Sequence, residues 1–473
     1  MRNATTRIAR LAPRRLSTAT ANAQAIAARG AALGVEFYQF SFVDLFGVQR
    51  SKLVPASRVA EIAEGGAGFA GFAAHLDMDP TQGDLLAVPD ASTLVALPWQ
   101  PNVGWLSCNL VHEGAELAHG PRNALRAVQA ALLAEHGLTL KTGVECEFFV
   151  VDASAAPGAP PAVADALDTQ AKPCYDAHAL MRRFDFVSEL VAHMERLGWG
   201  PYQADHEDAN GQFEINWDFD DALVTADRVV LFKYMARALA ERHGLRATFM
   251  PKPFARLTGS GCHAHVSLHD GATGANACLD AGGGGAAAHH ALSETARAFL
   301  GGLLAHAPAL TALTNPTVNS YKRLNARGTA SGATWSPTAA TWAGNNRTAL
   351  VRVPDGYRME LRLADMSANP YLLAAAIGAA GRDGLARGAA ACPPPTDANM
   401  YDASDPVVAA AVAAAPALPK SLPAALDALD DSAAMRAGLG DAFVDSYVKL
   451  RRAHWEEYAA HLSQWEVQAY LDC

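Results

Sequence analysis

Several segments of the chain alternate apolar and polar residues, which is the pattern of a β-strand with one buried face. In the segment TGVECEFFVVD (142–152), apolar side chains share one face, while Glu145 and Glu147 share the other. Two carboxylates on an otherwise apolar strand are most simply explained by a solvated face. This segment by itself therefore predicts a strand and leaves its chemistry open.

Three later segments repeat the alternation with an unusual set of polar residues. The segments are GQFEINW (211–217), GSGCHAHVSL (259–268) and YRMELRL (357–363). Their polar faces carry Gln212, Glu214, Asn216, His263, His265, Ser267, Arg358, Glu360 and Arg362. Solvated strand faces are usually rich in Lys and Thr, and none of these faces contains either residue. Chance explains any one strand, but the four together predict a functional surface.

The simplest fold is a curved antiparallel sheet with helices against its apolar side and a cleft along its charged side. Carboxylates and imidazoles that converge without lysines would repel one another unless cations lay between them. Oxygen ligands with one imidazole suit Mg²⁺ or Mn²⁺ better than Zn²⁺, and arginines at the rim suit phosphates. The pattern thus predicts Glu145 and Glu147 as metal ligands near a phosphate site.

The chain divides into a small N-terminal domain and a large one, preceded by an extension. Short alternating segments separated by turns predict a sheet-rich domain over 34–119. The segment 120–137 has Pro near its start and Gly at its end, which predicts a helix at the start of a large domain, 120–473. The loops at 152–167 and 280–290, rich in Gly, Pro and Ala, are assigned no chemistry.

The extension, residues 1–33, contains no acidic residue, and its arginines are scattered among Ala, Ser and Thr. This is the composition of a mitochondrial transit peptide, and RRLS (14–17) resembles a cleavage site for a matrix protease. A disordered extension on a bacterial protein would look the same. We expect a cytoplasmic protein, with the mitochondrial matrix as the alternative.

Composition narrows the classes of partner. The chain has 473 residues, half of them apolar, and a formal net charge of −10, which disfavours nucleic acid as a partner. Its seven cysteines form no CxxC pair, so we expect reduced thiols and neither zinc nor disulfides. Without an apolar run of about 18 residues, no membrane span is expected.

Six motifs carry a resemblance to a known family. They are GVECEFF (143–149), DHEDANGQFE (205–214), GSGCHAH (259–265), NPTVNSYKRL (315–324), NNRTALVRVP (345–354) and RMELRLADMSANPYL (358–372). In order, spacing and residue type they resemble the glutamine synthetase family, from about residue 35 to the C-terminus. CYDAHALMRRFDF (174–186) and SGATWSP (331–337) look most like the type III glutamine synthetases and the related glutamate–methylamine ligases.

The resemblance implies an α+β fold, in which a small β-grasp-like domain precedes a large domain whose curved antiparallel sheet lines the active site. It also implies two or three Mg²⁺ or Mn²⁺ ions per site. One ion would be held by Glu147, Glu207 and Glu214, and a second by Glu145, His263 and Glu360. Family members form dodecamers of stacked rings with active sites between subunits, so we expect a homo-oligomer.

The resemblance assigns the substrate-binding residues as well. Arg323 and Arg362 match the arginines that hold the carboxylates of glutamate, and the Gly259 backbone lies at its amino-acid end. The residues that match the ATP site are Phe219, His265, Ser267, Arg347, Arg352 and Arg358. Those expected to act in catalysis are Arg323, Arg347 and Arg362. In the implied reaction, ATP phosphorylates the γ-carboxylate of glutamate, and ammonia or a small primary amine attacks the γ-glutamyl phosphate.

Two departures from the family pattern concern the amine. Where the family carries an aspartate that helps to bind ammonium, this chain has Ala70, and its flap at 325–346 lacks the usual proton-accepting glutamate. The candidate substitutes are Asp176, Asp205 and Asp208. The flap also contains Trp335, Pro337 and Trp342. Tryptophan faces favour alkylated cations, although such residues also pack flaps onto domains. We therefore expect a short alkylamine to be used at least as well as ammonia.

Two other functions compete with a ligase. A catalytically silent scaffold or regulator with the same fold would be expected to lose metal ligands, and all six are present. A phosphotransferase acting on another acid or on a guanidine is less consistent with the arginines that match the glutamate site. The ligase is therefore the favoured interpretation.

Overall fold

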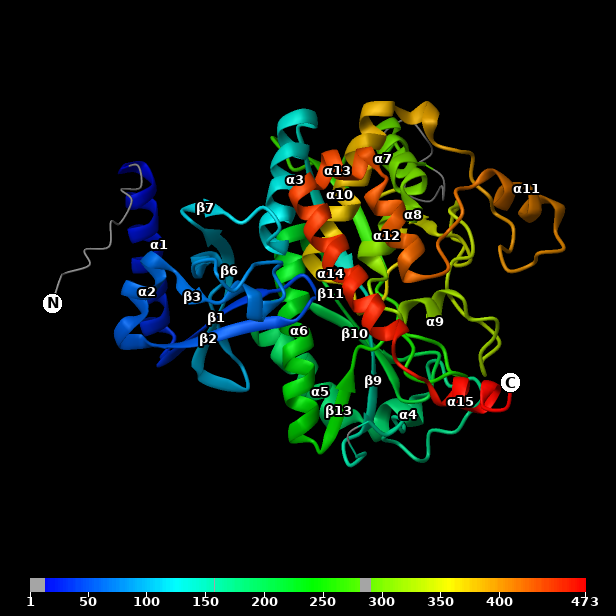
Figure 1. Ribbon diagram of the computed structural model, residues 1–473, viewed down its shortest axis with the longest axis horizontal. Coiled ribbons are helices and arrows are strands. Elements are labelled where there is room, and N and C mark those ends of the chain that lie inside the picture. The colour runs from blue at the N-terminus through cyan, green and yellow to red at the C-terminus, as the bar shows by residue number, and fades with distance from the viewer. Residues whose placement is uncertain (1–12, 157, 281–290) are drawn as a thin grey trace. The chain divides into compact units, whose positions relative to one another are not determined.

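The computed structural model describes residues 13–156, 158–280 and 291–473 (Figure 1). The chain divides into two compact units, Met1–Asn123 and Ala124–Cys473. The first twelve residues of the extension and residues 281–290 lie outside the described residues, so the structure does not bear on the expectations made for them.

The first unit contains a seven-stranded mixed sheet. Its strands are β1 (Phe37–Val43), β2 (Gln49–Pro55), β3 (Ala67–Phe69), β4 (Leu85–Pro89), β5 (Val95–Leu97), β6 (Gln100–His112) and β7 (Ala115–Glu116). The order is β2-β1-β6-β4-β3, with β5 and β7 also paired to β6, and β1 runs parallel to β6. On β1, the side chains of Phe40 and Phe42 lie two residues apart, share one face of the strand and are both buried. The apolar positions of the alternating pattern therefore lie in the core of this unit.

A helix, α1 (Pro13–Ala32), precedes this sheet. The expectation of a disordered extension is therefore wrong for residues 19–32, whose side chains are described. Ile26 is fully buried, and the Asn22 side chain donates a 2.8 Å hydrogen bond to the carbonyl of Pro89. An Ala-rich segment offers little apolar periodicity, and its order comes from packing against the unit.

The second unit contains two further sheets, of orders β10-β11-β9-β13 and β12-β8-β14-β17-β16-β15. Their strands are β8 (Leu138–Val144), β9 (Cys146–Asp152), β10 (Pro201–His206), β11 (Gln212–Trp217), β12 (Asp220–Asp221), β13 (Leu245–Thr248), β14 (Ala264–Asp270), β15 (Trp342–Ala343), β16 (Val351–Asp355) and β17 (Arg358–Leu361). Only β15 and β16 pair in parallel among these described strands. The predicted α+β class is confirmed, and the predicted antiparallel sheet is divided in two at Glu145, where the chain passes from β8 to β9.

The remaining helices are α2 (Val59–Gly65), α3 (Pro121–His136), α4 (Ala177–Arg182), α5 (Phe184–Arg196), α6 (Ala222–Arg242), α7 (Glu294–Ala305), α8 (Ala307–Thr314), α9 (Ser320–Leu324), α10 (Pro370–Arg387), α11 (Pro406–Ala414), α12 (Leu422–Asp430), α13 (Ala433–Leu439), α14 (Asp441–Ala459) and α15 (Gln464–Tyr470). In the described part of the chain, no single helix is long and apolar enough to cross a membrane. Helices α7 and α8 together have the length and apolar composition of a membrane span, but the chain bends by 75° between them.

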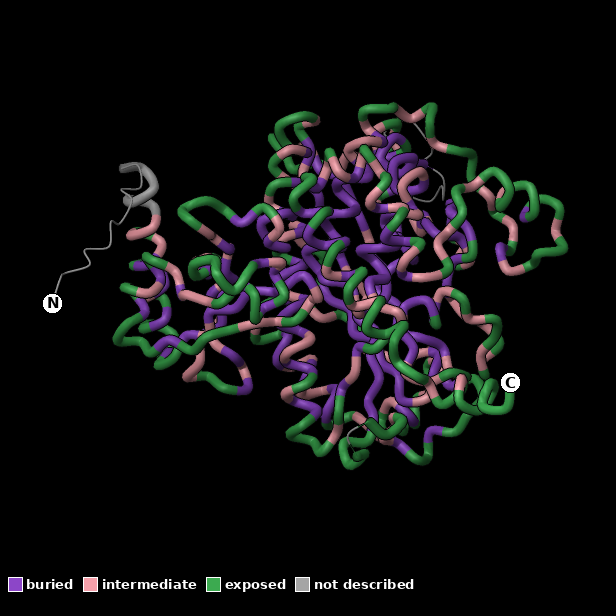
Figure 2. The backbone as a smooth tube through the Cα atoms, in the orientation of Figure 1, coloured by how far each residue is buried: buried purple, intermediate pink, exposed green. Residues whose placement is uncertain are grey.

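The core of the second unit lies between its sheets and the helices α5, α6 and α10 (Figure 2). On the four-stranded sheet, the Phe148 ring lies 5.9 Å from Phe232 of α6 and 6.3 Å from Phe186 of α5. On the six-stranded sheet, Thr225 of α6 donates a 2.6 Å hydrogen bond to the carbonyl of Thr142. Helices thus cover the apolar faces, which leaves the polar faces free for chemistry.

Candidate active site

One group of predicted metal ligands gathers where the two sheets meet. Glu145 joins β8 to β9, His263 directly precedes β14, and Glu360 lies on β17. Ligand atoms of the three side chains all lie within 4.8 Å of one another. His263 Nδ1 lies 2.8 Å from a Glu145 oxygen and 3.8 Å from a Glu360 oxygen, and its Nε2 is buried without a partner among the described residues. Two carboxylates and an imidazole at these separations fit a divalent cation.

The second group comprises Glu147, Glu207 and Glu214 on the four-stranded sheet. Glu147 on β9 lies opposite Glu214 on β11, and Glu207 directly follows β10. Burial raises the pKa of Glu207 well above its usual range, and the charge of Glu147 adds to the rise. Burial likewise raises the pKa of Glu214, with further repulsion from Glu145 and Glu147. A bound cation would remove this repulsion, so this group also fits a divalent metal.

Backbone and side-chain donors hold Glu147 in place. Gln212 donates to Glu147 Oε2 at 3.0 Å, and the backbone N–H of Gly261 donates to the same oxygen at 2.7 Å. A Cβ at position 261 would lie only 2.8 Å from Glu147 Oε1, so a larger residue there would displace this carboxylate. Gln212 also donates to the Gly259 carbonyl at 3.2 Å. The Gly-rich turn before β14 therefore positions Glu147, a predicted metal ligand.

Histidines and arginines keep the carboxylates of the first group ionised. Burial raises the pKa of Glu145, but hydrogen bonds to His263 and His265 outweigh it and hold the pKa well below its usual range. Burial also raises the pKa of Glu360, and the charge of Arg362 more than offsets this effect. Arg362 and Arg352 donate to the two oxygens of Glu360, the latter at 2.6 Å. Arg352 thus lies beside a predicted metal ligand.

The two arginines predicted to hold glutamate are both buried in the second unit. Arg323 is 3% exposed and Arg362 is 4% exposed. Arg323 donates to the carbonyl of Leu363 at 3.0 Å, and Arg362 Nε is buried without a partner among the described residues. Arg347 differs, because it is exposed and no described hydrogen bond or ion pair joins it to the ligand groups. Two buried guanidinium groups next to the carboxylate cluster suit an anionic substrate.

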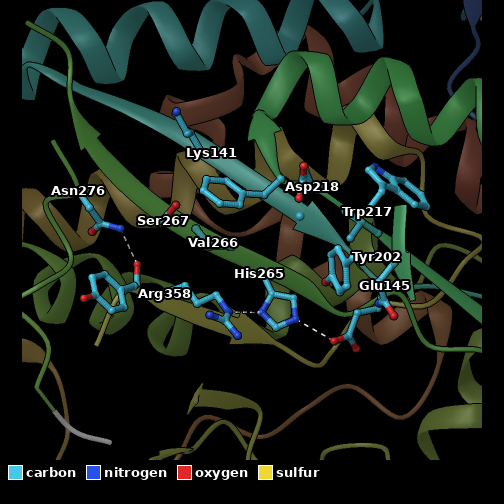
Figure 3. A pocket seen from close by; sticks show the side chains of 15 residues that line it. Lys141, Glu145, Tyr202, Trp217, Asp218, His265, Val266, Ser267, Asn276 and Arg358 are labelled. Carbon is cyan, nitrogen blue, oxygen red and sulfur yellow. Dashed lines mark hydrogen bonds and ion pairs between the residues drawn. The ribbon is translucent and has the colours of Figure 1, made fainter. Parts of the chain in front are cut away.

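A cavity of about 240 Å³ opens beside the first ligand group (Figure 3). Four of the residues predicted to bind ATP line it: Phe219, His265, Ser267 and Arg358. His265 links the cavity to the ligands, because its Nε2 lies 2.8 Å from a Glu145 oxygen and its Nδ1 accepts from Arg358 at 3.1 Å. An exposed aromatic ring beside cationic groups suits a nucleotide.

Sequence reasoning missed several residues that line this cavity. They include Lys141, Tyr202, Trp217, Asn276 and Tyr357. Lys141 lies on β8 one residue before the segment 142–152, so extending that alternation by one residue would have found it, whereas Trp217 ends β11 on the face that the sequence predicts to be apolar. Asn276 meets Tyr357 only through a 2.9 Å hydrogen bond to its carbonyl across 81 residues, and no local signal predicts such a contact.

The flap at 325–346 packs differently from the expectation for an alkylamine site. Trp342 is 3% exposed on β15, and its indole N–H donates to the carbonyl of Pro393 at 2.7 Å. Pro337 is also buried, whereas Trp335 is half-buried with a backbone φ of 53°. Trp342 and Pro337 therefore stabilise the flap and do not offer an open apolar face.

The structure distinguishes the three acids considered as proton acceptors. Asp176 is half-buried and caps α4 by accepting from the backbone N–H of Ala179. Asp208 accepts hydrogen bonds from two hydroxyl groups. Asp205 Oδ1 is buried without a partner among the described residues, and burial together with the charges of Glu145 and Glu147 raises the pKa of Asp205 to about 6.

Comparisons with known proteins agree with this geometry. A family profile described as glutamine synthetase, catalytic domain, matches residues 118–470. The chain is 48% identical over 438 residues to a glutamine synthetase of Rhizobium leguminosarum bv. phaseoli, which covers 93% of this chain and 97% of the relative. It is 41% identical over 442 residues to a glutamate–methylamine ligase of Methyloversatilis universalis, covering 93% and 96%. A solved GmaS complex with ADP superimposes with a TM-score of 0.87 at 52% identity, covering 95% of this chain and 99% of the other.

Replacing Glu214 by Gln removes one predicted metal ligand and one repelling charge. We expect Glu214→Gln to reduce the Mn²⁺-dependent rise in melting temperature, because the group of Glu145, His263 and Glu360 is left intact. Without metal, the variant should melt about 2–4 °C above the parent at pH 8, because repulsion is relieved. A raised folded-state pKa makes the parent more stable as pH falls, so the difference should shrink towards pH 6. Scanning calorimetry measures both effects.

The matched control is Glu294→Gln, whose side chain is 89% exposed on α7. It should leave both the metal response and the pH dependence unchanged. An undiminished Mn²⁺ response in Glu214→Gln would show that Glu214 is not a ligand.

Proposed function

The chain belongs to the glutamine synthetase family, and we propose that its amine substrate is a short alkylamine such as methylamine, used at least as well as ammonia. The protein is an ATP-dependent ligase of the glutamine synthetase type, which joins L-glutamate to ammonia or a small amine. The observation that carries the ligase chemistry is the gathering of the predicted metal ligands Glu145, His263 and Glu360 within 4.8 Å of one another, in the same unit as two buried arginines. A silent scaffold would have no reason to retain this repelling cluster.

The family uses ATP and divalent metals, and we propose two or three Mg²⁺ or Mn²⁺ ions per active site in this protein. Glu145, His263 and Glu360 would hold one ion, and the second group of carboxylates another. When bound, the ions would supply positive charge that neutralises the phosphates of ATP. The raised pKa of Glu207 supports the second position, because a buried carboxylate cluster without a cation resists ionisation.

The protein's own residues would bind and orient both substrates. Arg323 and Arg362 are placed to pair with the carboxylates of glutamate, while Phe219 and Arg358 would bind ATP in the cavity. A γ-carboxylate oxygen then bonds to the terminal phosphorus of ATP as the bond to the ADP oxygen breaks. The amine nitrogen next bonds to the acyl carbon, phosphate leaves, and the nitrogen loses a proton to a base. Arg347 and Arg352 would stabilise the transferring phosphoryl charge.

We assign the base to Asp205, because its carboxyl oxygen is buried without a described partner and its charge interacts with Glu145 and Glu147. Asp205→Asn should slow amide formation at pH 7 about 10²-fold or more. Activity should recover as pH rises towards 10, since more of the amine is then unprotonated. A pH series of amide formation measures this recovery.

Asp176→Asn is the matched control, because an asparagine can still cap α4 and this carboxylate already accepts a backbone hydrogen bond there. It should behave like the parent at every pH. Full activity of Asp205→Asn at pH 7 would exclude Asp205 as the base.

The choice of amine is tested with a panel of ammonia, methylamine, ethylamine and propylamine, with glutamate and ATP. We expect kcat/KM for methylamine to equal or exceed that for ammonia, because neither Ala70 nor the flap offers a carboxylate for ammonium. One methyl group contributes only about 1–3 kcal/mol of discrimination, so glutamine should remain detectable by mass spectrometry. A tenfold preference for ammonia over every alkylamine would identify a glutamine synthetase in the strict sense.

We propose that the protein assembles into a dodecamer of stacked rings, as the resemblance implies. Apolar side chains exposed near the C-terminus support association. They are Leu462, Trp465, Val467, Tyr470 and Leu471. Light scattering should give the mass of a dodecamer, and deleting residues 462–473 should yield smaller, less active particles. A monomer with full activity would contradict the proposal.

We also propose a cytoplasmic location. The relatives described above come from bacteria, which have no mitochondrial matrix. Sequencing the N-terminus of the protein from its native cell tests this location, because removal of the arginine-rich segment would indicate import.

A further inference from the structure

We infer that Asp208 is a positioning residue that fastens the 325–346 flap over the acyl-phosphate site through the hydroxyl groups of Thr258 and Ser331. This set of three residues is called the Asp208 latch below. The inference rests on the proposed ligase function and concerns how the reactive intermediate is kept from water. Asp208 would act through the flap and without touching a substrate.

The latch joins three separate segments of the chain. Ser331 in the flap donates to Asp208 Oδ2 at 2.5 Å, and Thr258 donates to the same oxygen. The two hydroxyl oxygens are 3.5 Å apart. Asp208 is 8% exposed and Thr258 is 5% exposed. Hydrogen bonds to an ionised carboxylate are among the strong ones, and they gain strength where water is excluded.

Asp208 and Thr258, the two partners of Ser331, lie beside residues of the predicted active site. The backbone N–H of Asp208 donates to Glu207 Oε2 at 2.8 Å, so the latch adjoins a predicted metal ligand. Thr258 immediately precedes Gly259, whose carbonyl accepts from Gln212. The position of the flap is thereby tied to the loops that carry the metal and glutamate sites.

The flap has few other anchors near Ser331. Ala330 donates its backbone N–H to the Arg256 carbonyl at 2.8 Å. Gly328 and Gly332 flank this stretch, and a Cβ at either glycine would meet nothing within 4 Å. A glycine-flanked segment in open space loses much conformational entropy when it is held in one position. The hydroxyl bonds to Asp208 would offset that loss and keep the flap closed.

A loosened flap would change the fate of the intermediate. With the flap closed, the amine nitrogen bonds to the acyl carbon and phosphate leaves. If water enters, a water oxygen bonds to the same carbon, the carbon–oxygen bond to phosphate breaks, and a proton is released. Glutamate and phosphate are then regenerated, so ATP is consumed without an amide product. The ratio of phosphate released to amide formed therefore reports flap closure, whereas general destabilisation lowers both amounts together.

The test compares the full-length parent with Ser331→Ala, Thr258→Val and the double variant, at saturating ATP, glutamate and methylamine. Each single variant should raise the phosphate-to-amide ratio about fivefold to tenfold, the effect expected for losing one hydrogen bond to a carboxylate. The double variant should fall well short of the product of the two effects, because both hydroxyls act through the same oxygen. Half-saturation by ATP should stay within twofold of the parent.

Thr338→Val is the matched control, since this exposed flap residue donates its hydroxyl to the Met400 carbonyl and does not contact Asp208. The control should keep the ratio of the parent. An unchanged ratio in Ser331→Ala and Thr258→Val would overturn the latch while leaving the ligase function intact. A parent that forms no amide with any amine would instead refute the proposed function, and the two failures are thus distinguishable.

Discussion

Repulsion among buried carboxylates at the junction of two sheets is the constraint on which the second unit depends. Burial and the neighbouring negative charges raise the pKa of Glu207 and Glu214. Without a bound cation, these carboxyl groups therefore lose their protons less readily. Such repulsion destabilises the folded protein, and a bound cation would offset it, so the cluster indicates a function that uses the cation. The helices that pack behind the sheets supply the apolar burial that holds these groups together.

The two groups of carboxylates differ in their cationic partners. Glu145 and Glu360 are paired with histidines or arginines, so both carboxylates stay ionised without metal. Glu207 and Glu214 have no such cationic partner among the described contacts. His265 then connects the paired group to the nucleotide-sized cavity through Glu145 and Arg358. The predicted metal ligands and the cavity are therefore parts of one hydrogen-bonded network.

Long-range packing decides between alternatives that the sequence left open at two places. The Ala-rich segment before residue 33 contains α1, and Ile26 is buried although no local pattern predicts it. Trp342 was a candidate for an amine site or for packing of the flap, and its indole donates to the carbonyl of Pro393, 51 residues further along the chain. Both outcomes have one physical cause, since burial of a side chain depends on segments distant in sequence.

The sequence by itself determined the strands that carry the predicted site and the residues that share each face, because the two-residue period of a strand places every second side chain on the same side. It also determined which acids are missing from the flap, since composition needs no coordinates. Tertiary structure alone decided that the sheet divides at Glu145, and which of the candidate acids remains without a partner. It also decided that Ser331 meets Asp208 across 123 residues. Such contacts depend on how loops close in space, and loop closure leaves no periodic pattern in the chain.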